Sequence, residues 1–246
     1  MQINDFLKEQ VNVEKKYLKI KGIPSVLWGR TTGKLFIAVH GNMSDKEDVP
    51  IYIFAKEAVK AGYQVLSFDL PEHGSRKSES VPCKVQNCIH ELEDILEYGK
   101  SISNNISLFA CSVGAYFSLA AYNHENLSKC LFLSPVVDME QIICTMLKQA
   151  GITEEKLKAE KKISTPFGQT FYWDYYCYVK EHPIENWEIL TSILYGSSDD
   201  LCKFEKIASF SKRFNCDLKI MENGEHFFHT EEQLCFFNQW LKDIFQ

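Results

Sequence analysis

Apolar runs of strand length alternate with segments of helical periodicity along most of the chain. Short, mostly apolar runs are typical of strands buried on both faces of a sheet, and they occupy residues 34–40, 64–69, 106–110, 129–134, 192–196 and 217–221. Apolar residues recur at helical spacing in 85–102, from 113 onward, near 203–214 and in 231–245. This alternation predicts an α/β fold, with a mostly parallel central sheet and helices on both faces.

The first part of the chain adds a hairpin and one more helix. Residues 17–22 alternate between polar and apolar positions, and a second strand-like run covers 24–30, so the two predict a β-hairpin. Ser44 or Asp45 can cap a helix that runs to about Ala61 and ends at Gly62. Residues 71–82 are polar and predict a loop.

The regular alternation stops between residues 139 and 187. This stretch contains one helix-like piece, a charged segment at 154–162 and a segment dense in aromatic residues at 167–178. We therefore predict a core formed by residues 1–138 and 188–246, with 139–187 inserted as a small cap. Such an insertion is expected above the carboxyl ends of the strands, where open α/β sheets bind ligands.

Ser112 stands at the junction between one strand and the next helix. The apolar run 106–110 precedes it, helical spacing follows it, and the small residues Ala110 and Gly114 lie two positions before and after it. Strand, tight turn and helix around a serine are the pattern of a nucleophile elbow, in which a sharp turn leaves no room for large neighbours. A serine between small residues also occurs in ordinary strand–helix turns, so other features must decide.

A second strand end offers backbone donors. The sequence His40-Gly41-Asn42-Met43 follows the strand at 34–40, and the glycine allows a close approach of the backbone. The N–H group of Asn42 or Met43, together with that of Val113, could form an oxyanion hole, in which each donor typically lowers the barrier by about 3–4 kcal/mol. A plain turn at the end of the strand would give the same residues.

A carboxylate and an imidazole follow the last two strands. Asp199 lies in a loop after 192–196, and His226 lies in a loop after 217–221. A serine hydroxyl needs a base to take its proton, a histidine can act as that base near neutral pH, and a carboxylate stabilises the resulting imidazolium. The order Ser112, Asp199, His226 is the order expected for this architecture.

Together these residues resemble the α/β-hydrolase superfamily, and the resemblance covers nearly the whole chain. The loop Asp69-Leu-Pro-Glu-His-Gly-Ser75 is similar to an Asp–Gly-His-Gly–Ser type of loop in that superfamily. The resemblance implies an α/β-hydrolase fold, a triad of Ser112, Asp199 and His226, and an oxyanion hole at Asn42 or Met43 with Val113. The chain departs from the superfamily pattern at Ala110 and Glu225, two positions where glycine is common. The Glu225 carboxylate is expected either to raise the pKa of His226 or to face solvent.

Other residues compete for these roles. Asp200 adjoins Asp199, and Asp138 follows the strand at 129–134, where some members carry the acid. His73 is expected to brace the loop near the site, and His229 to lie at the surface or at a helix start.

Aromatic residues of the predicted cap could line an apolar substrate pocket or pack the cap on the core. Phe171, Trp173 and Tyr176 are the candidates for substrate contact. They belong to a larger aromatic set that also contains Phe167, Tyr172, Tyr175 and Tyr178.

Composition narrows the range of partners. A formal net charge of −6 disfavours nucleic acid, and the chain lacks an apolar run long enough to span a membrane. The first ten residues show no basic stretch followed by an apolar core, so we expect no secretory signal.

Nine cysteines scattered through apolar segments fit buried thiols in a reducing cytoplasm. Cys83, Cys88 and His90 have poor spacing for a metal, and we expect neither metal nor cofactor.

The sequence thus predicts a cytoplasmic serine hydrolase that cleaves carboxylic esters of small or medium acyl groups through an acyl-enzyme. A thioesterase, a monoacylglycerol lipase or a peptidase on the same fold are alternatives, because a fold does not fix the leaving group. Two further alternatives are a cofactor-free lyase or peroxidase-type enzyme, and a non-hydrolytic binding module that retains the triad residues. The expected partner is a small-molecule ester, and the sequence leaves the oligomeric state open.

Overall fold

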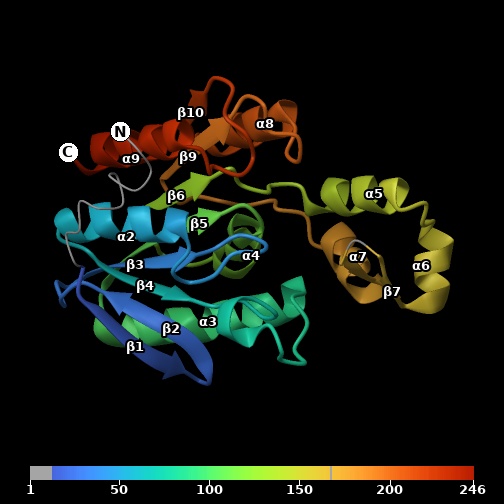
Figure 1. Ribbon diagram of the computed structural model, residues 1–246, viewed down its shortest axis with the longest axis horizontal. Coiled ribbons are helices and arrows are strands. Elements are labelled where there is room, and N and C mark those ends of the chain that lie inside the picture. The colour runs from blue at the N-terminus through green and yellow to red at the C-terminus, as the bar shows by residue number, and fades with distance from the viewer. Residues whose placement is uncertain (1–12, 167) are drawn as a thin grey trace.

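The computed structural model describes residues 13–166 and 168–246 (Figure 1). Phe167 and the N-terminal segment considered for a signal lie outside the described residues. In the described part, eight strands form one sheet in the order β1-β2-β4-β3-β5-β6-β9-β10. In chain order, their bounds are Lys15–Ile20 (β1), Ile23–Trp28 (β2), Lys34–Val39 (β3), Gln64–Phe68 (β4), Asn105–Cys111 (β5), Cys130–Leu133 (β6), Thr191–Gly196 (β9) and Asp217–Met221 (β10).

The sheet is mostly parallel, as predicted. β1 and β2 form the predicted antiparallel hairpin, closed at the pair Ile20↔Ile23, and β2 is also antiparallel to β4. All remaining neighbours in this sheet are parallel. The carboxyl ends of β3, β4, β5, β6, β9 and β10 therefore share one edge, and the loops that follow them lie near one another.

Helices cover both faces of the sheet. Val85–Ile102 (α3), Val113–Tyr122 (α4) and Phe204–Phe214 (α8) contribute buried residues to one apolar cluster, and Val49–Lys60 (α2) and Glu231–Phe245 (α9) contribute to the other. Alternate residues of one strand enter opposite clusters: Ile37 of β3 packs with α3 and α4, whereas Phe36 packs with α2 and α9. This two-sided packing explains why the central strands appear as continuous apolar runs in the sequence.

The start of α2 differs from the prediction. The helix begins at Val49 rather than after Ser44 or Asp45, because Asp48 is its N-cap and accepts a hydrogen bond from the Val49 N–H at 2.7 Å. Pro50 fits at the beginning of a helix, where its missing N–H has no acceptor to lose. The predicted cap residue Ser44 instead donates a hydrogen bond to Asp48 at 2.6 Å.

A segment of mixed structure is inserted between β6 and β9. It contains Met139–Gln149 (α5), Glu154–Glu160 (α6), the hairpin Lys162–Ser164 (β7) and Thr170–Tyr172 (β8), and Trp173–Glu181 (α7). In Figure 1 these elements project to one side of the sheet. The segment is more regular than the sequence predicts: α6 buries only Leu157, so it carries no apolar stripe that could reveal a helix. We retain the division into a core and a cap at 139–187 as a proposal.

Among the described helices, none combines the length and apolar character that a membrane span requires.

Candidate active site

Ser112 occupies a strained turn between β5 and α4. Its φ angle is +50°, in a region that residues with a side chain rarely adopt. Two backbone hydrogen bonds fix this turn to the next strand and to the residues after it: the Ser112 N–H donates to the Leu133 carbonyl, and the Val136 N–H donates to the Ser112 carbonyl, both at 3.0 Å. β5, β6 and α4 thus hold the Ser112 hydroxyl at the carboxyl edge of the sheet.

Close backbone contacts explain the small residues around Ser112. A Cβ atom at Gly114 would lie 2.3 Å from the His40 carbonyl oxygen, and one at Gly41 would lie 3.1 Å from the Ser112 Cβ. The end of β3 therefore crosses directly over the start of α4, and the position two residues after Ser112 needs glycine. Ala110, two residues before it, is completely buried in β5, where the structure accommodates a methyl group.

The side chains of Ser112, His226 and Asp199 form one hydrogen-bonded line. Ser112 Oγ lies 2.8 Å from His226 Nε2, and His226 Nδ1 lies 2.7 Å from Asp199 Oδ2. A carboxylate can only accept, so Nδ1 carries the proton that is donated to Asp199 and Nε2 is free to accept the Ser112 hydroxyl proton. This arrangement can make the hydroxyl nucleophilic.

Asp199 is fixed on its other side by the backbone of its own loop. Its Oδ1 accepts hydrogen bonds from the N–H groups of Leu201 at 2.9 Å and Cys202 at 2.7 Å, and its side chain is completely buried. The loops of Asp199 and His226 touch through glycines, since a Cβ atom at Gly196 would lie 2.3 Å from the Gly224 carbonyl oxygen. This contact was not predicted from the sequence, although Gly224, two residues before His226, is a visible signal for it.

The competing residues have other partners. Asp200 is exposed, next to the buried Asp199 carboxylate. Asp138 caps α5 by accepting from the Gln141 N–H at 3.0 Å and forms an ion pair with Lys206 at 2.7 Å. Of the described carboxylates, only that of Asp199 is in hydrogen-bond contact with the His226 ring.

In the loop that contains His226, the neighbouring side chains of Glu225 and His229 have other partners. Nδ1 of His229 lies 2.8 Å from the carbonyl oxygen of Phe227. The Glu225 carboxylate lies 3.3 Å from that same nitrogen and 3.4 Å from the Gln233 amide. Glu225 therefore pairs with the following turn and helix rather than with His226.

Two histidines brace the loop that follows β3. His40 is completely buried; its Nδ1 donates to the Gly41 carbonyl at 2.7 Å, and its Nε2 accepts from the Leu70 N–H at 3.0 Å. Burial lowers the pKa of His40 to about 4, so the ring is neutral at physiological pH. His73 Nε2 lies 3.1 Å from Asn42 Oδ1, which agrees with its expected bracing position.

The candidate oxyanion donors flank Ser112. Gly41, which precedes Asn42, packs against the Ser112 Cβ, and Val113 is the first residue of α4, so its N–H has no acceptor within that helix. Met43 has a φ angle of +59° and a side chain that is 92% exposed. The loop after β3 and the start of α4 thus both adjoin Ser112, whose turn lies at the positive end of the α4 dipole.

Asp69, at the end of β4, links the loops at 40–48 and 70–76. Its buried carboxylate accepts from the Lys46 Nζ at 2.8 Å, the Lys46 N–H at 3.0 Å and the Ser75 N–H at 2.9 Å. Burial opposes its charge, but these hydrogen bonds, led by that from the Lys46 side chain, lower the pKa of Asp69 overall. Asp69 therefore has a positioning role and touches none of the three aligned side chains.

The aromatic candidates for substrate contact pack inside the inserted segment. Phe171 and Tyr176 are each 4% exposed, and the Tyr176 hydroxyl donates to Glu154 at 2.9 Å. Trp173 is half-buried, with its ring 5.8 Å from that of Tyr176. Their surroundings match the packing alternative that the sequence left open.

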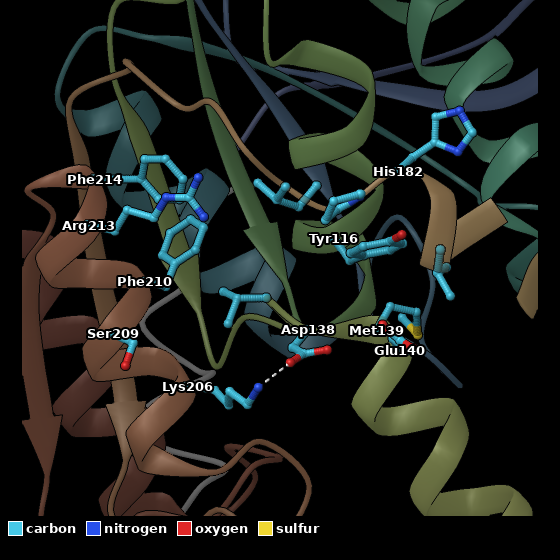
Figure 2. Close-up of a pocket in the computed structure, with 14 residues that line it drawn as sticks. Tyr116, Asp138, Met139, Glu140, His182, Lys206, Ser209, Phe210, Arg213 and Phe214 are labelled. Atoms are coloured by element: carbon cyan, nitrogen blue, oxygen red, sulfur yellow. Dashed lines mark ion pairs between the residues drawn. The ribbon is translucent and has the colours of Figure 1, made fainter. Parts of the chain in front are cut away.

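A cleft of about 290 Å³ lies between α8 and the inserted segment. Figure 2 shows Tyr116 of α4 in its centre, Phe210 and Arg213 of α8 on one side and His182 on the other. The Lys206–Asp138 ion pair bridges its rim. Tyr116 follows Ser112 by one turn of α4, and none of the three aligned side chains lines the cleft.

One group of potential metal ligands occurs among the described residues. One ligand atom from each of Asp199, Cys202 and His226 lies within 4.8 Å of the others. Burial raises the pKa of the Cys202 thiol far above its usual value, so it is a neutral thiol rather than a metal-binding thiolate. A metal ion would also have to break the Asp199–His226 hydrogen bond, so the residues fit a hydrogen-bonded triad better than a metal centre.

The cluster Cys83, Cys88 and His90, considered in the sequence, does not converge. Cys83 and Cys88 Sγ lie 3.8 Å apart, but the His90 side chain is 77% exposed and its Nδ1 lies 3.9 Å from Glu93.

Comparison with known proteins identifies the fold. No family model and no curated protein sequence matches the chain. Est1E from Butyrivibrio proteoclasticus, solved with ferulic acid, has a TM-score of 0.77 at 17% identity over 93% of this chain and 97% of its own. Mouse alpha/beta hydrolase domain-containing protein 10 has a TM-score of 0.73 at 13% identity, covering 94% and 98% of the two chains. The esterase Pf2001 of Pyrococcus furiosus has a TM-score of 0.66 at 17% identity, covering 100% and 94%.

The order of the strands and these likenesses together define the class: the chain has the α/β-hydrolase fold. The predicted fold class is thereby confirmed.

Proposed function

We propose that this protein is a serine hydrolase that cleaves carboxylic esters of small or medium acyl groups. The observation that carries the proposal is the hydrogen-bonded line from Ser112 through His226 to Asp199 at a strained strand–helix turn. The structural likeness to two esterases supports it. The proposed partner is a small-molecule ester, and the nine free thiols support a reducing, cytoplasmic location.

In the proposed reaction, Ser112 Oγ attacks the ester carbonyl while His226 Nε2 takes its proton. Asp199 holds the imidazole in the productive tautomer and stabilises the imidazolium. The Val113 N–H and that of Asn42 or Met43 stabilise the tetrahedral oxyanion. His226 then returns the proton to the departing alkoxide, and water cleaves the acyl-enzyme by the same steps in reverse.

The cleft is the proposed site for the part of the substrate remote from the ester bond. The Val136 N–H donates to the Ser112 carbonyl, and Val137 and Asp138, the next residues, line the cleft. The walls formed by Tyr116 and Phe210 suit an apolar or aromatic group. The bound ferulic acid of Est1E, an aromatic acid, is compatible with such a group.

The proposal is tested with a panel of nitrophenyl esters of rising chain length. Ser112→Ala and Asp199→Asn are expected to reduce kcat/KM by about 10⁴-fold, because each breaks the proton-transfer line. Asp200→Asn is the matched control and should retain activity, since that carboxylate is exposed. Undiminished ester turnover by folded Ser112→Ala protein would refute the assignment.

Labelling by a fluorophosphonate separates an enzyme from a binding module with the same fold. An activated Ser112 displaces fluoride and becomes phosphonylated, whereas an unactivated serine does not react. Absence of labelling, together with no turnover of any ester in the panel, would favour the non-hydrolytic alternative.

A further inference from the structure

Two thiols lie in contact beside the loop that carries His73. Cys83 Sγ and Cys88 Sγ are 3.8 Å apart. Cys83 is partly exposed at the end of the loop before α3, and Cys88 is completely buried in the first turns of that helix. A disulfide requires the two sulfur atoms to be about 2 Å apart, so the remaining gap is less than the movement of one side chain between rotamers.

The surroundings of His73 favour a positive charge next to this pair. Its Nδ1 faces the Pro71 carbonyl oxygen at 2.7 Å, and its Nε2 faces the Asn42 side-chain oxygen at 3.1 Å. Two acceptors are satisfied together only by an imidazolium, which has two N–H donors. Burial opposes this charge, but the adjacent Cys83 sulfur and the Pro71 carbonyl raise the pKa of His73 overall.

The two cysteines differ in the way that a reacting pair requires. A hydrogen bond from the Cys88 thiol, followed by the interaction with His73, lowers the pKa of Cys83 to about 6 against the effect of burial. Burial raises the pKa of Cys88 well above its usual range. Cys83 is therefore a partly exposed thiolate near neutral pH, and Cys88 is a protonated thiol shielded from solvent.

We propose that Cys83 and Cys88 form a modification site, at which a hydroperoxide such as hydrogen peroxide converts the two thiols into an intramolecular disulfide. The Cys83 thiolate attacks one peroxide oxygen, the O–O bond breaks, and the released hydroxide takes a proton to become water. The Cys83 sulfur, oxidised by two electrons, is then a sulfenic acid. The Cys88 sulfur attacks it, the S–S bond forms, the S–O bond breaks, and the departing hydroxide takes the Cys88 proton as a second water.

The disulfide connects to the loop after β3 through His73. Once Cys83 carries no negative charge, the imidazolium loses its anionic neighbour and a neutral ring keeps one N–H donor. The Pro71 carbonyl can only accept, so Nδ1 retains the proton and Nε2 becomes an acceptor. Asn42 must then present its amide N–H₂ group to His73 in place of its oxygen. Oxidation thus changes a hydrogen bond of the loop that flanks Ser112.

The site is tested on the full chain by peptide mass spectrometry. Reduced protein is exposed to hydrogen peroxide at pH 7, its free thiols are blocked with N-ethylmaleimide, and the protein is digested with trypsin. Cleavage after Lys84 separates the two cysteines, so the disulfide links the peptides 78–84 and 85–100. This linked pair is expected to form about tenfold faster than any oxidation of Cys235, an exposed thiol on α9.

Two variants separate the roles of the cysteines. Cys88→Ala should stop at the Cys83 sulfenic acid, which dimedone traps, and Cys83→Ser should leave Cys88 reduced because peroxide does not reach it. The proposal is overturned if Cys83 is oxidised no faster than Cys235 or pairs with a cysteine other than Cys88. If the Cys88 variant does not fold, the pH dependence of iodoacetamide alkylation decides on the wild-type protein: Cys83 should titrate near pH 6, and a midpoint at 8.5 or above overturns the proposal. None of these readouts depends on ester hydrolysis.

Discussion

At the scale of single residues, the proposed active site depends on two glycines, Gly41 and Gly114, whose lack of a side chain lets two backbone segments approach Ser112. Gly114 lies where the end of β3 passes over the first turn of α4, and the neighbouring atoms are backbone carbonyls that cannot rotate away. The same crossing brings Gly41 against the Cβ atom of Ser112, so the loop after β3 passes directly beside this residue. The missing side chains thus allow the hydroxyl and its candidate oxyanion donors to occupy one small space.

Gly114→Ala is expected to destabilise the protein by about 3 kcal/mol, because its Cβ would lie 2.3 Å from the His40 carbonyl oxygen and β3 and α4 would have to separate. Urea denaturation measures this loss, and ester turnover should fall with it. Ala110→Gly, on the other side of Ser112, is the control; loss of a buried methyl from a strand should cost only about 1 kcal/mol. Equal urea midpoints for Gly114→Ala and the wild type would contradict the proposed crossing.

The choice between the two neighbouring acids illustrates a limit of the sequence at this scale. Asp199 and Asp200 are chemically identical and adjacent, so residue type does not distinguish them, and the sequence favoured Asp199 only through its spacing from Gly196. In the structure, the direction of the chain after β9 separates them: it buries the Asp199 carboxylate against His226 and leaves Asp200 exposed. By contrast, Ser112 was recognisable as a candidate because a strand, a serine and a helix follow one another without interruption.

At the scale of elements, long periodic segments were predictable and short ones were not. The strands of the sheet and the bounds of α3 and α9 follow directly from apolar spacing. The start of α2 was predicted too early, at Ser44 or Asp45. Pro50 is favoured only in the first turn of a helix, so the helix begins just before it, and Asp48 is the residue that caps it. The strands β7 and β8 have three residues each, too few to show alternation, and they pair only because the chain turns back on itself between them.

α8 is the element on which substrate selection is expected to depend, because it forms one wall of the cleft. Ser209 lines the cleft and is exposed, so Ser209→Trp should narrow it with little effect on folding. We expect KM to rise about tenfold for long or aromatic esters and to change little for acetate, since loss of apolar contact costs about 1–3 kcal/mol. Lys212→Trp, on the same helix but outside the cleft, is the control. A uniform change across the ester panel would show that the cleft does not receive the substrate.

At the scale of the whole molecule, stability depends on pH through buried groups that link the loops. His40 is neutral in the folded protein because burial lowers its pKa to about 4, whereas in the unfolded chain its pKa has the ordinary value of 6.5. Above pH 6.5 the ring is neutral in both states, so folding carries no penalty. As the pH falls below 6.5, His40 is protonated in the unfolded chain but stays neutral in the folded protein. The free energy of unfolding therefore decreases until about pH 4.

This linkage predicts that the free energy of unfolding drops by about 2.5 kcal/mol between pH 7 and pH 4.5 on account of His40 alone. His40→Asn can still donate to the Gly41 carbonyl but does not titrate, so its stability should vary less with pH by that amount, although it starts lower. Urea denaturation at the two pH values measures both drops. Asp69, whose pKa is also lowered, contributes to both proteins and cancels in the comparison. Equal drops in the two proteins would refute the assigned role of His40.

The chain leaves the sheet after β6, forms the inserted segment and re-enters the sheet at β9. These two strands are direct neighbours in the sheet. Whatever length or sequence lies between them, the pairing of Leu133 with Leu194 restores the position of Asp199 relative to Ser112. The wall of the cleft that the segment forms can therefore vary separately from the aligned side chains, whereas the wall formed by α8 belongs to the same core as those side chains. Replacing the segment by another one during evolution is therefore expected to change the range of substrates that fit the cleft and to leave Ser112, His226 and Asp199 aligned.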